Sequence, residues 1–223
     1  IDGLKNKNTY ESLGYEAVFY YMPHLKKVLE NITDLPLYET PPFIAPYYYG
    51  NIEEKIRKKR ILIYPKFQNR DYEILIYLLK RNLNLKPRSG IQKLLNKKNS
   101  WELVELKDLK HHEVAKQMQI STFFISLNVN EAFNSAVPEA MAAGCINVCY
   151  EGFGPRDFLV NNKNAFVFQN NYVYDLGEKV ISLIQNFEKN EEVHQNMREE
   201  AYSTANKYKI EYLEKSLISY FKR

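Results

Sequence analysis

Short apolar runs that alternate with helical segments constrain the fold of this chain more than any other feature. The run at 60–64 (RILIY) is almost continuously apolar, as expected for a strand buried on both faces of a parallel sheet. Similar spacing and composition predict further strands over 101–106, 122–127 and 165–168, a strand that ends at Tyr150, and helices over 71–81, 111–119, 173–190, 192–206 and 208–221. Strands that alternate with helices indicate an α/β fold with a doubly wound, parallel, Rossmann-like sheet.

The first 57 residues have a different pattern. A β-prone segment at 16–21, a helix that opens at Pro23 and a second strand at 35–40 predict a small N-terminal βαβ remnant. The following stretch, TPPFIAPYYYG, holds three prolines and excludes a central strand, so we expect a linker. We therefore predict three parts: 1–57 as the end of an N-terminal domain plus linker, 58–206 as a Rossmann-like domain, and 207–223 as a C-terminal helix.

Composition narrows the class of protein. The 223 residues are 45% hydrophobic and carry a net charge of +4, which suits a globular protein with a real core and no need for nucleic acid. Cys145 and Cys149 have no metal-site spacing and fit a reduced, cytoplasmic setting. No apolar run reaches the ~18 residues of a membrane span.

The stretch 123–158 carries the chemistry. Glu131 and Glu139 stand on either side of a loop-to-helix junction, after the strand at 122–127. Lys66 and Arg70 follow the strand at 60–64. Ligands of such sheets bind at the carboxyl ends of the strands, where cations can neutralise phosphate and carboxylates can accept bonds from sugar hydroxyls. A nucleotide diphosphate attached to a sugar would need this set of groups.

The same stretch resembles a known family. Glu131, seven residues, Glu139 and then AMAAGCINV are similar to the E-x7-E signature of retaining glycosyltransferases with the GT-B fold, most like family 4. The turn EGFGPRDF after the next strand resembles that family's glycine-rich turn. The resemblance implies the C-terminal, donor-binding half of a GT-B fold. It implies an enzyme that transfers a sugar from a nucleotide-diphosphate donor to a hydroxyl acceptor with retention, in polysaccharide or glycoconjugate biosynthesis.

The resemblance also implies roles for individual residues. Glu139 would bind the ribose hydroxyls of the donor, and Glu131 would face the donor sugar near the reacting carbon as the catalytic residue. No metal or other cofactor is expected. The remaining donor-binding residues are Lys66 and Arg70 for the diphosphate and Phe133, Asn134 and Ser135 for the sugar and phosphate.

Two departures from the family pattern stand out. Ala132 and Asn134 occupy the positions of the two usual glycines of the first loop. Asn134 tolerates a left-handed backbone better than most residues, so we expect the turn to survive. Nearly all of an N-terminal, acceptor-binding domain is missing from these residues.

Other interpretations stay open. Glu139 alone could be an acidic residue favoured in the first turn of a helix, and Lys66 and Arg70 could be solvated loop cations. The basic run at 80–98 could steer a carbohydrate or glycolipid acceptor, or a membrane surface, although a solvated insertion is favoured. We expect His111 and His194 on the surface. The alternatives for the whole chain are a non-catalytic glycosyltransferase-like subunit that binds or stabilises a partner, and a generic Rossmann-like domain for another nucleotide.

Overall fold

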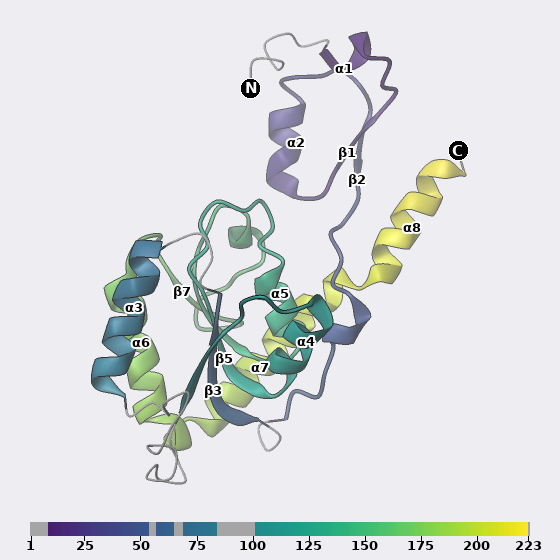
Figure 1. The fold of residues 1–223 in the computed structure, drawn as a ribbon. Helices are drawn as coiled ribbons and strands as arrows, with labels where there is room; N and C mark the ends of the chain where they lie inside the picture. Colours follow the sequence, from purple (N-terminus) through teal and green to yellow (C-terminus); the bar gives the residue numbers. More distant parts are fainter. Residues whose placement is uncertain (1–8, 54–56, 65–68, 84–100, 223) are drawn as a thin grey trace. The chain divides into compact units, whose positions relative to one another are not determined.

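A computed structural model describes residues 9–53, 57–64, 69–83 and 101–222, and the chain forms two compact units (Figure 1). We call Ile1–Phe43 with Lys207–Arg223 the terminal unit and Ile44–Asn206 the sheet unit. Each is described by itself.

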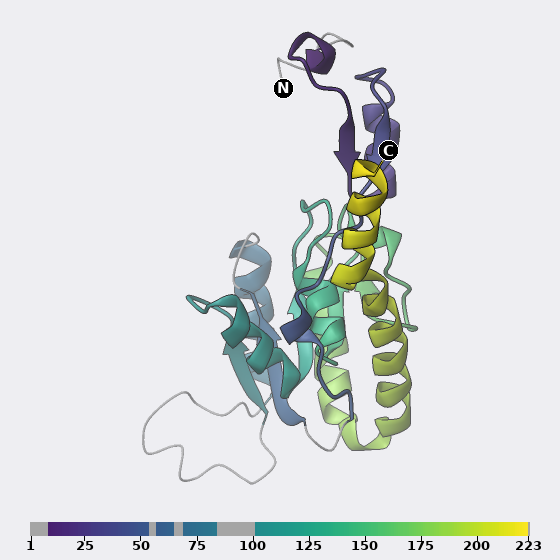
Figure 2. The same cartoon turned by 90° about the vertical axis from the view of Figure 1, so that its right-hand side faces the viewer.

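The terminal unit is built on two parallel strands, β1 (Val18–Tyr20) and β2 (Leu37–Glu39), joined by helix α2 (Pro23–Leu29). This confirms the predicted βαβ remnant. Helix α8 (Ile210–Phe221) lies beside the strands (Figure 2): the Tyr220 ring meets the rings of Phe19 and Tyr38 at 4.7 Å, and the Ser216 hydroxyl donates to the Glu39 carbonyl. Helix α1 (Thr9–Ser12) precedes β1. Among the described residues, none of the helices has the length and apolar character needed to cross a membrane.

The sheet unit holds a five-stranded parallel sheet in the order β4-β3-β5-β6-β7. This order confirms the predicted doubly wound topology, because the chain changes its direction of travel across the sheet between β3 and β5. The strand bounds are β3 (Lys58–Ile63), β4 (Glu102–Glu105), β5 (Ser121–Ser126), β6 (Ile146–Tyr150) and β7 (Phe166–Phe168).

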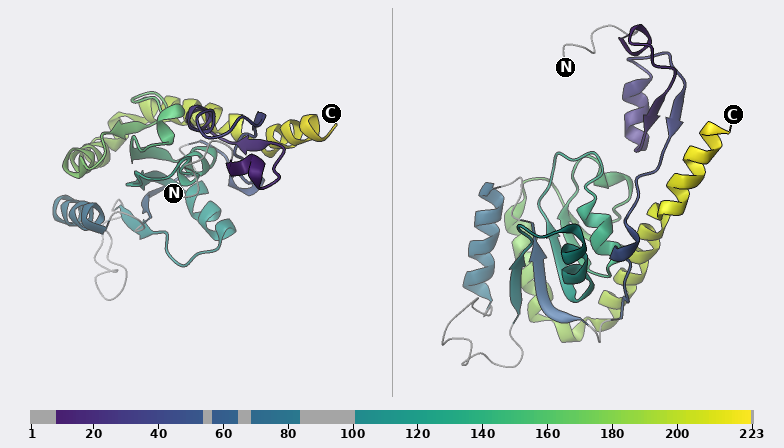
Figure 3. Two further views of the ribbon diagram at one scale, coloured as in Figure 1. Left: turned by 90° about the horizontal axis from the view of Figure 1, so that it is seen from above. Right: turned by 45° about the vertical axis from the view of Figure 1, so that its right-hand side comes forward.

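Helices cover both faces of this sheet, as the views in Figure 1 and Figure 3 agree. Alternate residues of β5 explain the two layers: Phe123 and Ile125 pack with Leu75 and Leu176 on one side, whereas Phe124 lies against Tyr64 on the other. The helices are α3 (Asn69–Asn82), α4 (His111–Gln119), α5 (Ala136–Ala142), α6 (Val173–Gln185) and α7 (Glu191–Ala205), with short 3-10 turns η2 (Pro46–Tyr48), η5 (Pro155–Asp157), η6 (Phe187–Lys189) and η7 (Asn206–Tyr208).

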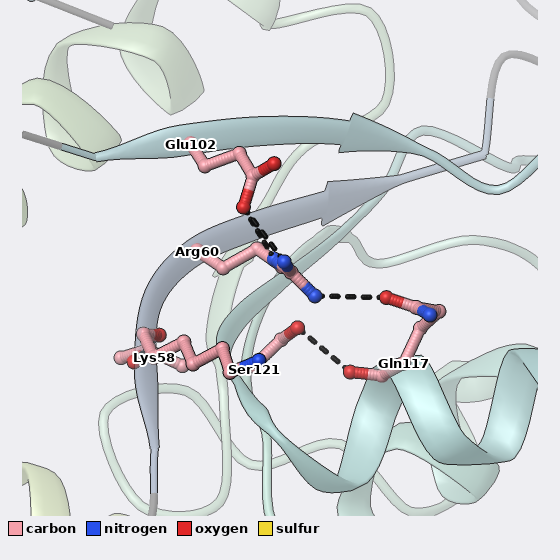
Figure 4. A network of polar contacts seen from close by, with 6 residues as sticks. Lys58, Arg60, Glu102, Gln117 and Ser121 are labelled. Carbon is pink, nitrogen blue, oxygen red and sulfur yellow. Dashed lines mark hydrogen bonds and ion pairs between the residues drawn. The ribbon is translucent and has the colours of Figure 1, made fainter. Parts of the chain in front are cut away.

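A polar network fixes α4 at the amino ends of the strands (Figure 4). The Arg60 guanidinium of β3 donates two bonds to Glu102 of β4 and one to the Gln117 side chain of α4. The Ser121 hydroxyl donates to the Gln117 carbonyl at 2.7 Å. Because the network sits at the amino ends, it supports the sheet and leaves the carboxyl ends open for a ligand.

Arg57 acts as a clamp where α4 and α5 end. Its guanidinium donates to the carbonyls of Met118 and Ser121 at 3.1 and 3.0 Å, and to those of Asn51 and Ala143 at 2.6 Å. The last of these is a carbonyl at the C-terminus of α5, where a cation also meets the negative end of the helix dipole.

The structure corrects the prediction that His194 is a surface residue. His194 of α7 is fully buried, and its ring stacks on Phe187 at 5.0 Å. Burial is the main cause that lowers the pKa of His194 to about 4, with the charges of Arg198 and Lys179 adding to it. The imidazole is therefore a neutral part of the core at physiological pH.

Candidate functional site

A cavity of about 570 Å³ opens at the carboxyl ends of β3, β4 and β5. In parallel sheets this edge is where ligands bind, and they favour the place where the chain reverses its course across the sheet. The cavity lies at that place, between β3 and β5. Its lining comes from the ends of three strands and from α4 and α5: Tyr64, Leu106, Lys107, Asp108, Leu109, His111, Val114, Ser126, Leu127, Asn128, Glu131, Asn134, Ser135, Ala136 and Glu139.

Glu139 lies in the first turn of α5 and is partly buried in the wall of this cavity. Burial raises the pKa of its carboxyl group to about 7. A hydrogen bond from the Tyr48 hydroxyl opposes that rise in pKa, and the negative charge of Glu131 adds to it. Glu139 is thus a carboxyl group held near its titration point at neutral pH, which is typical of functional sites.

Glu131 reaches the same cavity from the loop between β5 and α5. The structure therefore brings together the two glutamates that the sequence singled out, with Asn134 and Ser135 beside them. Two carboxylates in one cavity can accept hydrogen bonds from several hydroxyl groups of one ligand.

Asn134 holds the turn between the two glutamates. Its φ of +54° is in the left-handed region, which confirms that the turn forms without the usual glycine. Its side chain is buried and donates to the Ser126 hydroxyl at 3.1 Å, so it ties the loop to β5.

Phe133 is buried, and its ring lies against that of Phe158 at 5.7 Å, so its side chain anchors the loop outside the cavity lining. Arg70 is an exposed residue of α3 and does not line the cavity. Lys66 lies outside the described residues. The donor-binding roles assigned to these three residues stay predictions.

The glycine-rich turn after β6 packs against the loop that carries Glu131. The Gly154 amide donates to the Glu131 carbonyl at 3.3 Å, and a Cβ placed on Gly154 would lie 1.6 Å from the Ala132 carbonyl oxygen. Gly152 has a φ of +56°, and Arg156 folds back to donate to the Gly152 carbonyl. These residues shape the turn and do not line the cavity.

Sequence reasoning missed three aromatic or basic neighbours of Glu139. Tyr64 follows β3, and burial followed by the charge of Glu139 raises the pKa of its phenol to about 12. His111 is exposed, as predicted, but it also lines the cavity. Tyr48 comes from η2, inside the stretch expected to be a linker, and its aromatic run PYYYG was the only signal.

The raised pKa of Glu139 predicts a pH-dependent stability. The folded chain holds this proton more tightly than the unfolded chain, so the cost of burying the charge is absent below pH 4.5 and complete above pH 7. Glu139→Gln removes that cost. We expect this variant to gain up to about 3 kcal/mol of unfolding free energy over the wild type between pH 4.5 and pH 8, at ~1.4 kcal/mol per pKa unit.

The measurement is urea unfolding followed by the fluorescence of Trp101, the single tryptophan, which is buried in the sheet unit. Glu178→Gln, the same change on an exposed position of α6, is the control. If the unfolding free energies of the wild type and Glu139→Gln changed in parallel with pH, that result would contradict the raised pKa of Glu139.

The chain is similar in sequence to known proteins. A family profile described as "Glycosyl transferases group 1" matches residues 88–203. The poly(glycerol-phosphate) alpha-glucosyltransferase of Bacillus subtilis (strain 168) is 31% identical over 93 residues, which cover 41% of this chain and 13% of that protein.

Solved structures share the fold. A TarM variant of S. aureus, in complex with Fondaparinux, alpha-GlcNAc-glycerol and UDP, superposes with a TM-score of 0.70 at 16% identity over 96% of this chain and 45% of that one. A glycosyltransferase from Rickettsia africae superposes with a TM-score of 0.70 at 16% identity, over 97% of this chain and 66% of that one. Sucrose-phosphate synthase from Thermosynechococcus elongatus superposes with a TM-score of 0.66 at 13% identity, over 97% of this chain and 59% of that one. The chain therefore spans less than half of TarM, and at these identities the likeness shows the fold alone.

Proposed function

The chain belongs to the group 1 family of glycosyl transferases, and from this we propose that it forms the donor-binding part of a retaining, family 4-like enzyme. The enzyme would transfer a sugar from a nucleotide diphosphate to a hydroxyl acceptor, in polysaccharide or glycoconjugate biosynthesis. The observation that carries the proposal is the pairing of Glu131 and Glu139 in one cavity at the carboxyl ends of β3, β4 and β5.

The proposed pose follows from the family resemblance. Glu139 accepts bonds from the ribose hydroxyls, and Glu131 faces the donor sugar. The loop from Phe133 to Ser135 lies beside the sugar and phosphate, and the diphosphate extends toward Lys66 and Arg70. UDP is the first nucleotide to try, because the TarM structure contains it.

Charge is the central chemical demand on such a site. When the glycosidic bond to the diphosphate breaks, negative charge grows on the departing phosphate and must be stabilised. Lys66 and Arg70 are the proposed cations for this step. Transfer without a metal ion is part of the proposal and comes from the family resemblance.

The wider setting is proposed on the same basis. The acceptor would be a carbohydrate or glycolipid hydroxyl, and the site of action would be the cytoplasm, at the inner face of the membrane. The second candidate function is a non-catalytic glycosyltransferase-like subunit that stabilises a partner. The retained pair of carboxylates favours the enzyme, because a scaffold has no chemical need for both in one cavity.

A thermal-shift screen of the chain in its full natural length tests the proposal. The ligands are UDP, GDP, ADP, TDP and CMP with their common sugar conjugates, without added metal. We expect one nucleotide to raise Tm by about 5–10 °C at a hundredfold excess over its Kd, because that excess stabilises the folded chain by about 2.7 kcal/mol. The shift should disappear in Glu139→Gln and persist in the surface control Glu178→Gln. A screen in which none of the nucleotides raises Tm would overturn the donor site.

A further inference from the structure

Ser126 is the last residue of β5 and places a hydroxyl group in the lining of the cavity. It follows Phe124 by two residues, so it lies on the face of the sheet where Phe124 meets Tyr64. Ser126 is buried. A buried hydroxyl needs hydrogen-bond partners, because bulk water no longer supplies them. The identity of these partners decides what the hydroxyl can do.

One partner of Ser126 is Asn134, from the turn between the two glutamates. The Asn134 side chain donates from Nδ2 to the Ser126 hydroxyl oxygen at 3.1 Å, and both residues are buried in the cavity wall. A serine hydroxyl has one donor hydrogen and an asparagine amide has two, and the contact between the two side chains uses one of them. The other donor hydrogens are not used by this contact, whichever way the amide is oriented. The pair can therefore donate hydrogen bonds to a ligand in the cavity.

Asn134 carries its side chain at a position that favours glycine. Its φ of +54° lies in the left-handed region, which most side chains disfavour, and the family resemblance places a glycine there. A glycine would fit the turn but would leave the Ser126 hydroxyl without this partner. Backbone strain of this kind concentrates at binding sites, where the surrounding structure holds it in place. The asparagine thus has a conformational cost, and its side chain provides an oriented hydroxyl on Ser126.

The chemistry of the cavity gives this hydroxyl a use. The ionised carboxylates of Glu131 and Glu139 accept hydrogen bonds from ligand hydroxyls and donate none. A nucleotide-diphosphate sugar also carries acceptors, namely its phosphate oxygens and the oxygens of its hydroxyl groups. Ser126 and Asn134 line the same cavity as the two glutamates and supply the donor hydrogens that these acceptors require.

We propose that Ser126 is a further residue that binds the sugar donor: its hydroxyl, oriented by Asn134, donates a hydrogen bond to an oxygen of the nucleotide-diphosphate sugar. The inference deepens the proposed function and rests on it, because it takes the cavity as the donor site. The oxygen belongs to the diphosphate or to the transferred sugar, both of which are proposed to lie beside the loop from Phe133 to Ser135. Both are hydrogen-bond acceptors, and two probes distinguish them.

Calorimetric affinities of the chain in its full natural length test this contact. The probes are the nucleotide that responds in the thermal screen and its sugar conjugate. UDP and UDP-glucose come first, because the TarM structure contains UDP and the Bacillus subtilis relative is named a glucosyltransferase. Ser126→Ala should weaken the binding of UDP-glucose by about threefold to tenfold, as expected for one hydrogen bond. The same loss for UDP assigns the contact to the diphosphate, whereas an unchanged affinity for UDP assigns it to the sugar.

Thr122→Val is the matched control. Thr122 is a buried residue on the same face of β5, and its hydroxyl donates to the Lys58 carbonyl at 2.8 Å, at the amino end of the sheet. The variant loses a buried hydrogen bond of the same strand, and Thr122 is not one of the residues that line the cavity. It should bind both probes like the wild type.

A second pair of variants separates a contact with the ligand from a tie within the protein. Asn134→Gly suits the left-handed turn and removes the tie. If the Ser126 hydroxyl contacts the ligand, adding Ser126→Ala to Asn134→Gly must weaken the binding of UDP-glucose further, by at least about twofold. If the hydroxyl only anchors the loop through Asn134, the double variant binds like Asn134→Gly, and the inference is overturned.

The double variant also decides the question if Ser126→Ala alone does not fold. It lacks both partners of the buried hydrogen bond, so neither is left unsatisfied in the folded chain. Its comparison with Asn134→Gly then replaces the comparison of Ser126→Ala with the wild type.

The outcomes keep this inference apart from the proposed function. If Ser126→Ala binds UDP-glucose like the wild type while Glu139→Gln loses binding, the role of Ser126 is wrong and the donor site stands. If Thr122→Val loses as much affinity as Ser126→Ala, the effect comes from the stability of β5 and the inference fails. A wild-type chain that binds none of the nucleotides overturns the donor site and this inference together.

Discussion

Glu131→Gln should lower the turnover number of the enzyme, in its full natural length, by about a hundredfold to a thousandfold, while nucleotide affinity changes by less than tenfold. Carboxylates that meet charge developing in the transition state typically contribute effects of that size. Glu131 lines the cavity beside Glu139, and as the proposed catalytic residue it faces the donor sugar, where positive charge grows as the bond to the diphosphate breaks. Glutamine keeps the shape of the side chain and removes the charge.

Steady-state kinetics separates the two roles of the glutamates. A loss confined to kcat identifies an interaction made in the transition state, whereas a loss confined to KM identifies ground-state binding. We expect Glu131→Gln to give the first pattern, with Glu178→Gln on α6 as the control. Turnover within threefold of the wild type would remove Glu131 from the catalytic role.

Gly154→Ala should disable the site although Gly154 is not one of the residues that line it. The new Cβ would lie 1.6 Å from the Ala132 carbonyl oxygen and 2.2 Å from its carbon, and neither backbone atom can rotate away. The Glu131 loop must therefore move. We expect a loss of about 2–4 kcal/mol in unfolding free energy, as for other severe overpacking, and at least a tenfold loss of nucleotide affinity.

Trp101 fluorescence in urea measures the stability, and calorimetry measures the affinity. Gly177→Ala is the control because its Cβ would meet the flexible end of Leu78 at 2.9 Å, inside a helix that favours alanine. Equal unfolding free energies of Gly154→Ala and the wild type would contradict the close contact between the turn at Gly154 and the loop that carries Glu131.

The sequence predicts the sheet well because its buried strands are nearly continuous apolar runs. The run at 60–64 overlaps β3 (Lys58–Ile63), and the helix predicted over 111–119 coincides with α4. Both glutamates of the cavity can also be predicted from the sequence, because they lie in the loop and the helix of one strand–loop–helix motif. The long helix expected over 173–190 is in fact α6 followed by the turn η6, a break at Asn186 that apolar spacing does not show.

What the sequence conceals depends on contacts between distant segments. Tyr48 meets Glu139 only because its segment docks on α4, α5 and α7, and none of these contacts follows a local rule. His194 has the polarity of a surface residue, but the packing of α7 turns it onto Phe187. The donor-binding role expected of Arg70, an exposed residue of α3 outside the cavity lining, stays a prediction.

The Arg57 clamp has a consequence for domain exchange among relatives. A donor-half module that is cut out at the first residue of β3 keeps every strand of the sheet and both glutamates. It would leave behind the guanidinium that joins the ends of α4 and α5, together with Gly50 and the phenol on Glu139. A recombination junction placed before Ile44 keeps these anchors with the helices they hold, so chimeric chains assembled there inherit the contacts that fix α4 and α5 at the cavity.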